Sequence, residues 1–440
     1  MTSVTGSFMF LVMLVMVSST ASGIAPSSTT TSFSQQWSKV FDGNKQDLYE
    51  TVLIYNQKIF LAGTGQEPVN SYSGAFYAKY SMDGVLERAS PLTNNGPDAW
   101  RVPESIVQSG GNLYDVAHLG SSFSTEHGLL TSYDANYSGG MSIEWGDHVR
   151  NEVPLDLAIV GSDIYVCGYV DAGSNAQNAT IMKFNSTLSS IMNASLDLGN
   201  NEQFDHIATS GTRIIVAGTI TNGTTLSRDI IIGEFYPANS SFGWVTWGSS
   251  TRNEVCTGFA ISGTSYYICG YCNDTAKKTE AFLVKLDMTC SEAWSVTWGG
   301  VEDDYAYALA CDSSGVYIVG QTCSRTSNPS TDSQAFIAKY DGDGNLLGDT
   351  TWGGSRFDCA KDIAISGDIV VCCGGTNASS TDMPLSNAMV TKFTVITVTG
   401  STPGVDGPST VAIFIVSFCG VLFIARKVVA KLHRGSRLEQ

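Results

Sequence analysis

The sequence predicts an all-β protein, a seven-bladed β-propeller of four-stranded antiparallel blades, with an N-terminal signal segment and one C-terminal transmembrane helix. First, a unit of about fifty residues recurs seven times between Trp37 and Val398, a period typical of propellers. Second, an aromatic residue stands 22 or 23 positions ahead of a strand-ending glycine in five copies. These pairs are Phe41 and Gly63, Trp145 and Gly168, Trp247 and Gly270, Trp298 and Gly320, and Trp352 and Gly374.

Each unit contains four short segments that are apolar or alternate in polarity, separated by Gly, Asn, Asp and Ser, the pattern of a four-stranded antiparallel sheet. One such sheet cannot bury both of its faces, whereas seven sheets arranged radially can. The propeller is expected over residues 35–398. Its blades are expected near residues 42–92, 93–145, 146–198, 199–247, 248–298, 299–352 and 353–398.

The segment 35–41 is expected to close the ring as the outermost strand of the last blade. Residues 37–41 match residues 294–298, which form the closing strand of an earlier copy. Third strands carry a lysine at one register, where a solvated or edge-guarding position is expected. These lysines are Lys79, Lys183, Lys285, Lys339 and Lys392. The second copy is degenerate, with His118 in place of the strand-ending glycine.

The two ends of the chain predict export and anchoring. Residues 1–25 hold a short apolar run followed by small residues, which predicts a cleaved signal peptide; an uncleaved anchor is the alternative. A linker, 399–409, leads to an apolar segment at 410–430, long enough to span a bilayer, and then to a basic tail at 431–440. We therefore expect a single-pass type I protein of the cell membrane, with the repeats extracellular and the tail cytoplasmic.

Composition narrows the possible partners. The formal net charge of −17 repels phosphate backbones, so nucleic acid is not expected as a partner. The protein is expected to be a monomer. Ten of eleven cysteines lie between Cys167 and Cys373, where burial or disulfides are expected rather than metal or redox chemistry. Eight glycosylation sequons suit an exported glycoprotein. They stand at Asn136, Asn178, Asn185, Asn193, Asn222, Asn239, Asn273 and Asn377.

Two stretches carry a family resemblance. Trp298 to Asn345 follows the order W-G-G-x-x-x-D, then V-Y-I-V-G, then A-F-I-A-K-Y-D-x-x-G-N, and Trp352 to Phe393 repeats W-G-G-x-x-x-D followed by I-V-V-C-C-G and A-M-V-T-K-F. This order resembles the seven-bladed β-propeller repeats of exported prokaryotic surface proteins, and it implies the fold while leaving the activity open. The Thr402 to Val405 stretch, with the apolar helix and basic tail, is similar to archaeal surface-anchoring C-termini. Val405 stands where those termini have Phe, which departs from their processing motif.

The strongest candidate site is an acidic register sixteen residues ahead of the strand-ending glycine. It comprises Asp47, Glu152, Glu202, Glu254, Asp304 and Asp358, and the second copy has Val102 there. At the start of each innermost strand these carboxylates are expected at one mouth of the central channel, where a ring of them could bind Ca²⁺ or a cationic ligand group. Alternatively, each side chain accepts backbone N–H bonds within its own turn. No other cofactor is expected.

No catalytic constellation is visible, so an enzyme is not expected. There is no Gly-x-Ser-x-Gly elbow before a helix and no pair of histidines at metal-ligand spacing. The sequence favours a binding or display module for surface glycans or proteins, acting through loops at the channel mouth. A glycan-acting hydrolase or lyase that uses the acidic residues, and a structural component of the cell envelope, are the alternatives.

Overall fold

The computed structural model describes residues 28–41, 47–66, 73–90, 99–121, 124–147, 149–173, 176–222, 225–249, 252–273, 278–377 and 387–400. The expected signal segment, transmembrane helix and basic tail lie outside these residues. So does the 401–409 part of the expected linker. Within the described ranges, no helix is long and apolar enough to cross a membrane.

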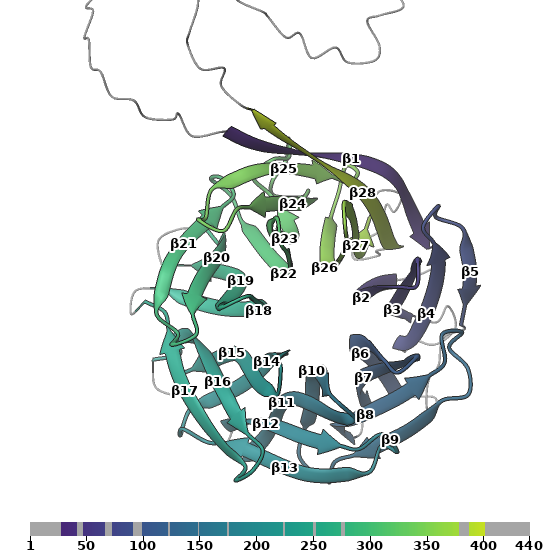
Figure 1. Ribbon diagram of the computed structural model, residues 1–440, viewed down its shortest axis with the longest axis vertical. Helices are drawn as coiled ribbons and strands as arrows, with labels where there is room; N and C mark the ends of the chain where they lie inside the picture. Colours follow the sequence, from purple (N-terminus) through teal and green to yellow (C-terminus); the bar gives the residue numbers. More distant parts are fainter. Residues whose placement is uncertain are drawn as a thin grey trace, which may run out of the picture. The chain divides into compact units, whose positions relative to one another are not determined.

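The described chain forms seven four-stranded antiparallel sheets arranged radially, which confirms the predicted seven-bladed propeller (Figure 1). Blades 1 to 6 each run from an innermost strand outward in chain order. Blade 1 comprises β2 (Asp47–Tyr55), β3 (Lys58–Gln66), β4 (Ser73–Ser81) and β5 (Leu86–Ala89). Blade 2 comprises β6 (Ala99–Ser109), β7 (Asn112–Ser121), β8 (Ser124–Tyr133) and β9 (Met141–Trp145). Blade 3 comprises β10 (Glu152–Val160), β11 (Asp163–Gly173), β12 (Ala176–Phe184) and β13 (Ser190–Leu196). Blades 4 and 5 are β14 (Asn201–Ser210), β15 (Arg213–Thr221), β16 (Arg228–Tyr236) and β17 (Ser241–Trp247); and β18 (Asn253–Ser262), β19 (Ser265–Asn273), β20 (Glu280–Asp287) and β21 (Glu292–Trp298). Blade 6 is β22 (Asp304–Asp312), β23 (Gly315–Thr322), β24 (Gln334–Tyr340) and β25 (Leu346–Trp352).

Blade 7 combines both ends of the described chain. Its strands are β26 (Asp358–Ser366), β27 (Ile369–Thr376), β28 (Asn387–Gly400) and, outermost, β1 (Ser28–Phe41). Figure 1 shows β1 lying along β28 and then passing toward β4 of blade 1. The N-terminal strand therefore completes the last sheet, and this pairing joins the last blade to the start of the chain without a covalent link between them.

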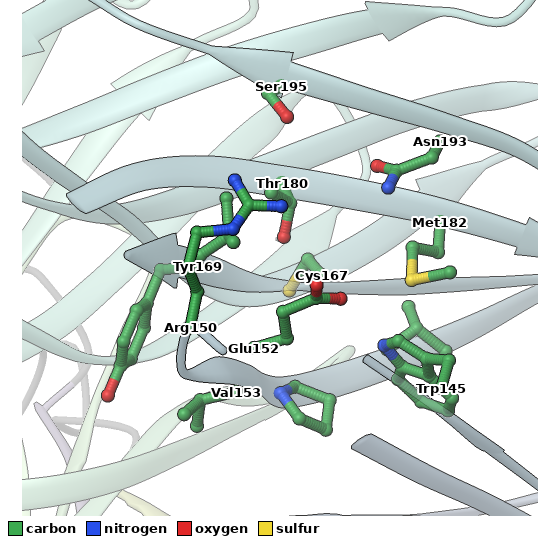
Figure 2. A pocket seen from close by; sticks show the side chains of 13 residues that line it. Trp145, Arg150, Glu152, Val153, Cys167, Tyr169, Thr180, Met182, Asn193 and Ser195 are labelled. Carbon is green, nitrogen blue, oxygen red and sulfur yellow. The ribbon is translucent and has the colours of Figure 1, made fainter. Parts of the chain in front are cut away.

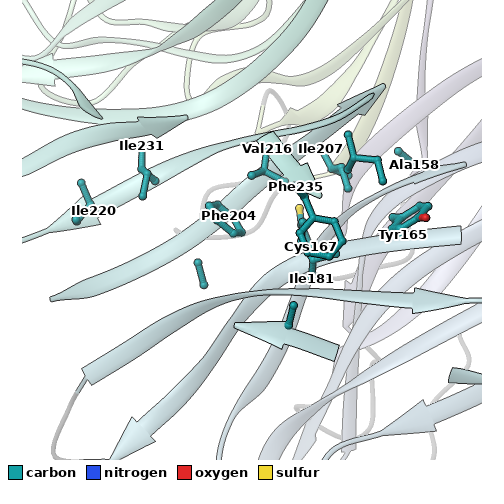
Figure 3. Close-up of a cluster of buried hydrophobic side chains, with 13 residues drawn as sticks. Ala158, Tyr165, Cys167, Ile181, Phe204, Ile207, Val216, Ile220, Ile231 and Phe235 are labelled. Atoms are coloured by element: carbon teal, nitrogen blue, oxygen red, sulfur yellow. The ribbon is translucent and has the colours of Figure 1, made fainter. Parts of the chain in front are cut away.

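Apolar side chains from neighbouring blades form the core. In the cluster between blades 3 and 4 (Figure 3), Cys167 and Ile181 of one blade pack with Phe204 and Val216 of the next, and all four are at most 1% exposed. Burying such side chains contributes about 1.5–3 kcal/mol each, so the interfaces between blades stabilise the ring. A single blade keeps these faces covered only while both neighbours are present.

An aromatic stack joins several neighbouring blades. At the end of β21, Trp298 stacks on Phe336 of blade 6 with ring centroids 3.8 Å apart and planes 16° apart. Phe41 of β1 likewise stacks on Phe76 of blade 1, and Trp247 of blade 4 contacts Phe282 of blade 5 with its ring plane tilted by 32°. The aromatic residues that marked the repeat in the sequence thus connect neighbouring blades at these interfaces.

Three lysines of this register join neighbouring blades, whereas Lys183 and Lys339 bond to residues of their own blades. The expectation of a solvated position is wrong for the buried Lys339. Lys79 of blade 1 donates to the carbonyl of Ala135 in blade 2 at 3.0 Å, and Lys285 of blade 5 donates to Gly342 in blade 6 at 2.7 Å. Within blade 6, Lys339 is 1% exposed and donates to Ser314 Oγ at 2.9 Å. A carbonyl in an outer turn is an acceptor that a flexible cation reaches across the interface between blades.

Blade 2 departs from the others because a polar network replaces part of its apolar core. Arg101 is buried and forms an ion pair with Asp115 at 3.0 Å, and it also donates to the Tyr133 hydroxyl at 3.0 Å. Burial alone would lower the pKa of Arg101, but the carboxylate of Asp115 and the phenol oxygens nearby raise it. This buried, bonded network explains why the second copy is hard to recognise in the sequence.

Candidate functional site

A one-residue β-bulge interrupts all seven innermost strands at the same register. In β2, for example, the pairing with β3 shifts between Tyr49 and Thr51, which leaves Glu50 as the extra residue. A bulge re-aims a side chain and is common next to functional sites. The seven bulged residues are Glu50, Glu104, Leu155, Asp205, Thr257, Tyr307 and Lys361.

The bulged residues lie around a central cavity. Its volume is about 620 Å³ including its open ends, and residues from all seven blades line it. Six of the seven bulged residues belong to this lining, and in blade 4 the lining residue is His206, next to the bulged Asp205. The structure therefore has a polar channel whose lining differs from blade to blade. We name the seven bulged residues the bulge ring.

In several blades a side chain on the second strand supports the bulged residue. His118 Nδ1 lies 2.9 Å from a Glu104 carboxylate oxygen, and Thr219 Oγ1 donates to Asp205 at 3.1 Å. The Tyr307 hydroxyl lies 3.3 Å from Gln321 Oε1. Because His118, Thr219 and Gln321 occupy one repeat position, the same local geometry holds several bulged side chains in place.

Two aspartates directly after a bulge connect adjacent blades inside the channel. Asp362 of blade 7 accepts hydrogen bonds from the Val52 N–H at 2.8 Å and the Thr51 hydroxyl at 3.1 Å in blade 1. Asp156 of blade 3 accepts a bond from the Ile207 N–H of blade 4 at 3.0 Å. These carboxylates replace backbone pairing across the interface and fix the innermost strands relative to each other.

The enclosed carboxyls of the channel hold their protons more tightly than usual. Burial raises the pKa of Glu50 to about 7; Lys361 opposes this shift and the nearby Glu104 adds to it. Burial likewise raises the pKa of Asp205 and of Asp362 to about 6 in each case. The channel therefore contains carboxyl groups that exchange protons near neutral pH.

The two channel histidines are shifted toward the protonated form. For His118, burial lowers the pKa, but the hydrogen bond and the charge of Glu104 raise the pKa by a larger amount, so the net shift is upward. For His206, burial is again outweighed by Asp156 and Asp205. Each histidine lies beside a carboxylate, His118 beside Glu104 and His206 beside Asp156.

The predicted acidic register lies elsewhere, three residues before each bulge, and none of its six members is among the residues that line the central cavity. Asp304 accepts from the Gly300 N–H at 2.8 Å and Asp358 from the Gly354 N–H at 2.7 Å. Glu202 accepts from the Asn200 N–H at 3.0 Å. Glu254 is 3% exposed and accepts from the Ser249 N–H at 3.4 Å, and Asp47 is 1% exposed. This geometry favours the turn-bonding interpretation for these carboxylates.

Strand pairing also corrects the register in the second copy. Ala117, not His118, pairs with the residue before the bulge, Pro103. The position equivalent to Asp47 is therefore Arg101 and not Val102, because it lies three residues before the bulged Glu104. The carboxylate of the other blades is replaced here by a buried cation.

Glu152 is the exception in the acidic register. It is partly exposed and lines a second cavity, of about 490 Å³ including its open mouth, between blades 2 and 3. In Figure 2 its carboxylate lies amid the lining side chains, with Trp145 and Tyr169 on opposite sides. Within the described part of the chain, no hydrogen bond is made to this carboxylate, unlike those of Glu202 and Asp304. We name this cavity the blade 2–3 slot.

The other predicted residues have simple placements. Asn136, Asn193, Asn222 and Asn239 are exposed. Asn178, Asn185 and Asn273 are half-buried, and Asn377 is 3% exposed, so a glycan there would disrupt the fold. The ten described cysteines are free thiols, six of them buried, with Cys269 and Cys272 in the apolar interfaces between blades. Within the described ranges, no group of three or more His, Cys, Asp or Glu residues could hold a metal ion.

The fold and the channel define the chain as a seven-bladed β-propeller protein. Among solved structures it is similar to the polysaccharide lyase Uly1, with a TM-score of 0.51 and 9% identity over 78% of this chain and 89% of that one. It is also similar to a chain of a mitotic checkpoint complex, with a TM-score of 0.50 and 12% identity over 88% and 98% of the two chains. For the β-propeller domain of the trilobed protease from Pyrococcus furiosus the TM-score is 0.44, at 9% identity over 79% and 95%. At these identities the likeness shows the fold alone.

Comparison of sequences adds little. No protein-family model matches the chain. Regulatory protein FlaEY of Caulobacter vibrioides is 30% identical over 109 residues, which are 22% of this chain and 11% of that protein. The chain thus spans about a tenth of the length of this relative.

Proposed function

We propose that the protein is a membrane-anchored extracellular propeller that binds and displays surface glycans or proteins, with the polar channel as its recognition site. The apolar segment 410–430 and the basic tail support a single-pass type I anchor, and the acidic composition argues against nucleic acid as a partner. Propellers commonly place recognition at such a scaffold's centre because the ring is rigid.

The variety of the bulge ring is the observation that carries this proposal. A position with a purely structural role keeps one kind of side chain, as the acidic register does with Asp or Glu in six of the seven blades. The bulge ring has two Glu, one Asp, one Lys, one Tyr, one Thr and one Leu at a single register. Such an asymmetric set of donors, acceptors and charges can recognise an asymmetric polar ligand, which disfavours the purely structural alternative.

A glycan array probed with the soluble propeller, residues 26–400, tests the proposal. We expect retention on a small set of glycans and its loss in Lys361→Ala, which removes the cation of the bulge ring. The matched control is Lys58→Ala, whose side chain pairs with Glu87 on the exterior. If no glycan is retained and no surface protein is captured in parallel, the proposal is wrong.

A second candidate function is hydrolysis or elimination on a glycan. The raised pKa of Glu50, about 7, favours it, because a group that is half protonated near neutral pH can donate a proton, and a second carboxyl group, Glu104, lines the same cavity. Incubating the protein with a panel of polysaccharides and measuring new reducing ends and unsaturated products tests this function. Activity that is lost in Glu50→Gln supports an enzyme, whereas glycan binding without turnover supports a binding module.

A further inference from the structure

The blade 2–3 slot is an aromatic binding position that its own chain leaves unfilled. Blades 5 and 6 carry Phe282 and Phe336 at the register paired with the strand-ending glycine. The equivalent residue of blade 3, paired with Gly168, is Thr180. Where Phe336 stacks under Trp298, blade 3 therefore presents only a small hydroxyl side chain under its neighbour's tryptophan.

Trp145, the tryptophan beside the slot, is not stacked as Trp298 is, and blade 3 has no phenylalanine at the register of Phe336. Trp145 packs against Phe184 with ring centroids 5.1 Å apart and planes tilted by 50°, rather than stacking on its blade 3 counterpart. Its indole lies over Gly128, where a Cβ would come within 2.1 Å of the ring. One indole wall thus remains in the cavity, together with the side chain of Met182.

The polar groups of the slot have also changed from those of the filled interface. In blade 6, Asp349 accepts from the Trp298 indole N–H at 3.1 Å and pairs with Arg325. The equivalent residue of blade 3 is Asn193, beside Ser195 on β13. With Thr180, Glu152 and Arg150 they supply an amide, hydroxyls, a carboxylate and a guanidinium around the indole wall (Figure 2).

We propose that the blade 2–3 slot binds one pyranose residue of a glycan, with an apolar sugar face on Trp145 and hydroxyl groups bonded to Glu152 and Asn193. A pyranose combines one apolar face with a rim of hydroxyls, which matches this lining. An aromatic side chain of a partner protein would fit the indole wall but would cover the Glu152 carboxylate and the Asn193 amide without bonding to them, at a penalty for each group taken out of water. The polar rim therefore favours a sugar over an aromatic peptide side chain.

This inference rests on the proposed function and gives it a second recognition position, apart from the channel. Its test uses the full-length chain produced without N-glycosylation, because Asn193 lies in a sequon and an attached glycan would cover the slot. The probes are methyl glycosides of glucose, galactose, mannose and N-acetylglucosamine. Binding is followed by saturation-transfer NMR and calorimetry, because the chain has eight tryptophans and their fluorescence would not report on one of them.

The decisive variant is Thr180→Phe, which places in the slot the phenyl ring that blades 5 and 6 carry at this register. We expect at least one methyl glycoside to bind the parent chain and its affinity to fall at least about tenfold in Thr180→Phe. Glu152→Gln should weaken binding by about tenfold, as expected for a lost hydrogen bond to a charged group. Glu254→Gln is the matched control, because Phe282 lies beside that carboxylate in blade 5.

Each outcome separates the slot from the wider proposal. Glycan-array binding that Thr180→Phe leaves unchanged would overturn the slot and leave the binding module standing. Methyl glycoside binding that is lost in Thr180→Phe, with no retention on the array, would support the slot and overturn the channel as the recognition site. If none of the glycosides binds, or if N-acetylphenylalanine amide binds in their place, the sugar assignment is wrong.

Discussion

The indole N–H of Trp37, in the strand that closes the ring, donates a hydrogen bond of 3.1 Å to the carbonyl of Met82 in blade 1. The same carbonyl accepts a bond from Lys392 at 2.8 Å. Trp294 and Lys285 share the Gly342 carbonyl in the same way, at 3.0 and 2.7 Å. The joint between the two ends of the chain therefore repeats an interface that elsewhere lies within a continuous chain.

Replacing Trp37 by Ala should loosen this joint. The half-buried indole and its hydrogen bond are lost, and we expect a decrease in the free energy of unfolding of about 2–3 kcal/mol. Trp294→Ala removes the same contacts from blade 5 and is the matched control. Limited proteolysis should cleave within residues 28–41 only in Trp37→Ala, and equal cleavage in both variants would contradict the closing role. Deleting residues 35–41 should lower the melting temperature much further.

Gly84 should resist substitution for two separable reasons. Its φ of +77° is unfavourable for other residues, and an added Cβ would lie 2.9 Å from the Trp37 ring. At Gly110, φ is +57° and no atom lies within 4 Å of an added Cβ. We therefore expect Gly110→Ala to destabilise by about 1 kcal/mol and Gly84→Ala by about 2–4 kcal/mol in chemical unfolding. Similar losses would show that Trp37 does not pack against this turn.

The stability of the propeller should fall as the pH rises from 5 to 8. The pKa of Glu50 is raised in the folded state, so the folded protein binds more protons than the unfolded chain above the ordinary carboxyl pKa, and stability is lost as the pH rises toward 7. Asp205 and Asp362, with pKa values of about 6, act in the same direction. His118, whose folded pKa is also raised, loses its stabilising proton over the upper part of this window.

Glu50→Gln isolates one contribution to this pH dependence. In the parent protein the Thr64 hydroxyl donates to the Glu50 carboxylate at 3.2 Å. The amide oxygen of the variant can still accept this hydrogen bond, but the amide cannot ionise. We expect the variant to gain up to about 3 kcal/mol at pH 8 relative to the parent and little at pH 5, measured by calorimetry at both values. A parent protein that becomes more stable between pH 5 and 8 would refute the enclosed state of these carboxyls.

Asp304 should matter for folding rather than for calcium binding. It accepts from the Gly300 N–H and from the Ser324 hydroxyl at 2.7 Å while fully buried. We expect Asp304→Ala to destabilise by about 2–4 kcal/mol and Asp304→Asn by less, because the amide oxygen keeps one acceptor. Thermal unfolding with and without millimolar calcium completes the test. A calcium-dependent rise in the melting temperature that is lost in Asp304→Asn would restore the cation-binding interpretation.

The repeat was readable from the sequence because its markers are spaced regularly along the chain. The spacing of Trp298 and Gly320 recurs in other copies of the unit and so marks the repeat. The stacking of Trp298 on Phe336 explains why an aromatic residue is needed at this position. The match between residues 37–41 and 294–298 similarly pointed to the outermost strand of blade 7. These features depend on local pattern and on the burial of apolar faces, which sequence reasoning handles well.

The channel was not readable because a bulge leaves little trace in composition. Glu50, Thr257 and Lys361 share a structural position but no chemical property, so a search for a repeated residue type found the buried acidic register three positions earlier. A search at fixed offset for positions with unusually varied polar residues would have found the bulge ring. The slot needed the structure too, because Thr180 becomes informative only when it is aligned with Phe336 through strand pairing.

The extra residue in each innermost strand separates ligand recognition in the channel from the packing of the blades against each other. Six of the seven bulged side chains line the channel and none belongs to the apolar clusters between the blades, so exchanging one of the six alters what the channel presents without removing those apolar contacts. Six variable positions of this kind allow relatives with the same disc to differ in their ligands. The same separation makes them the natural positions at which to redesign specificity.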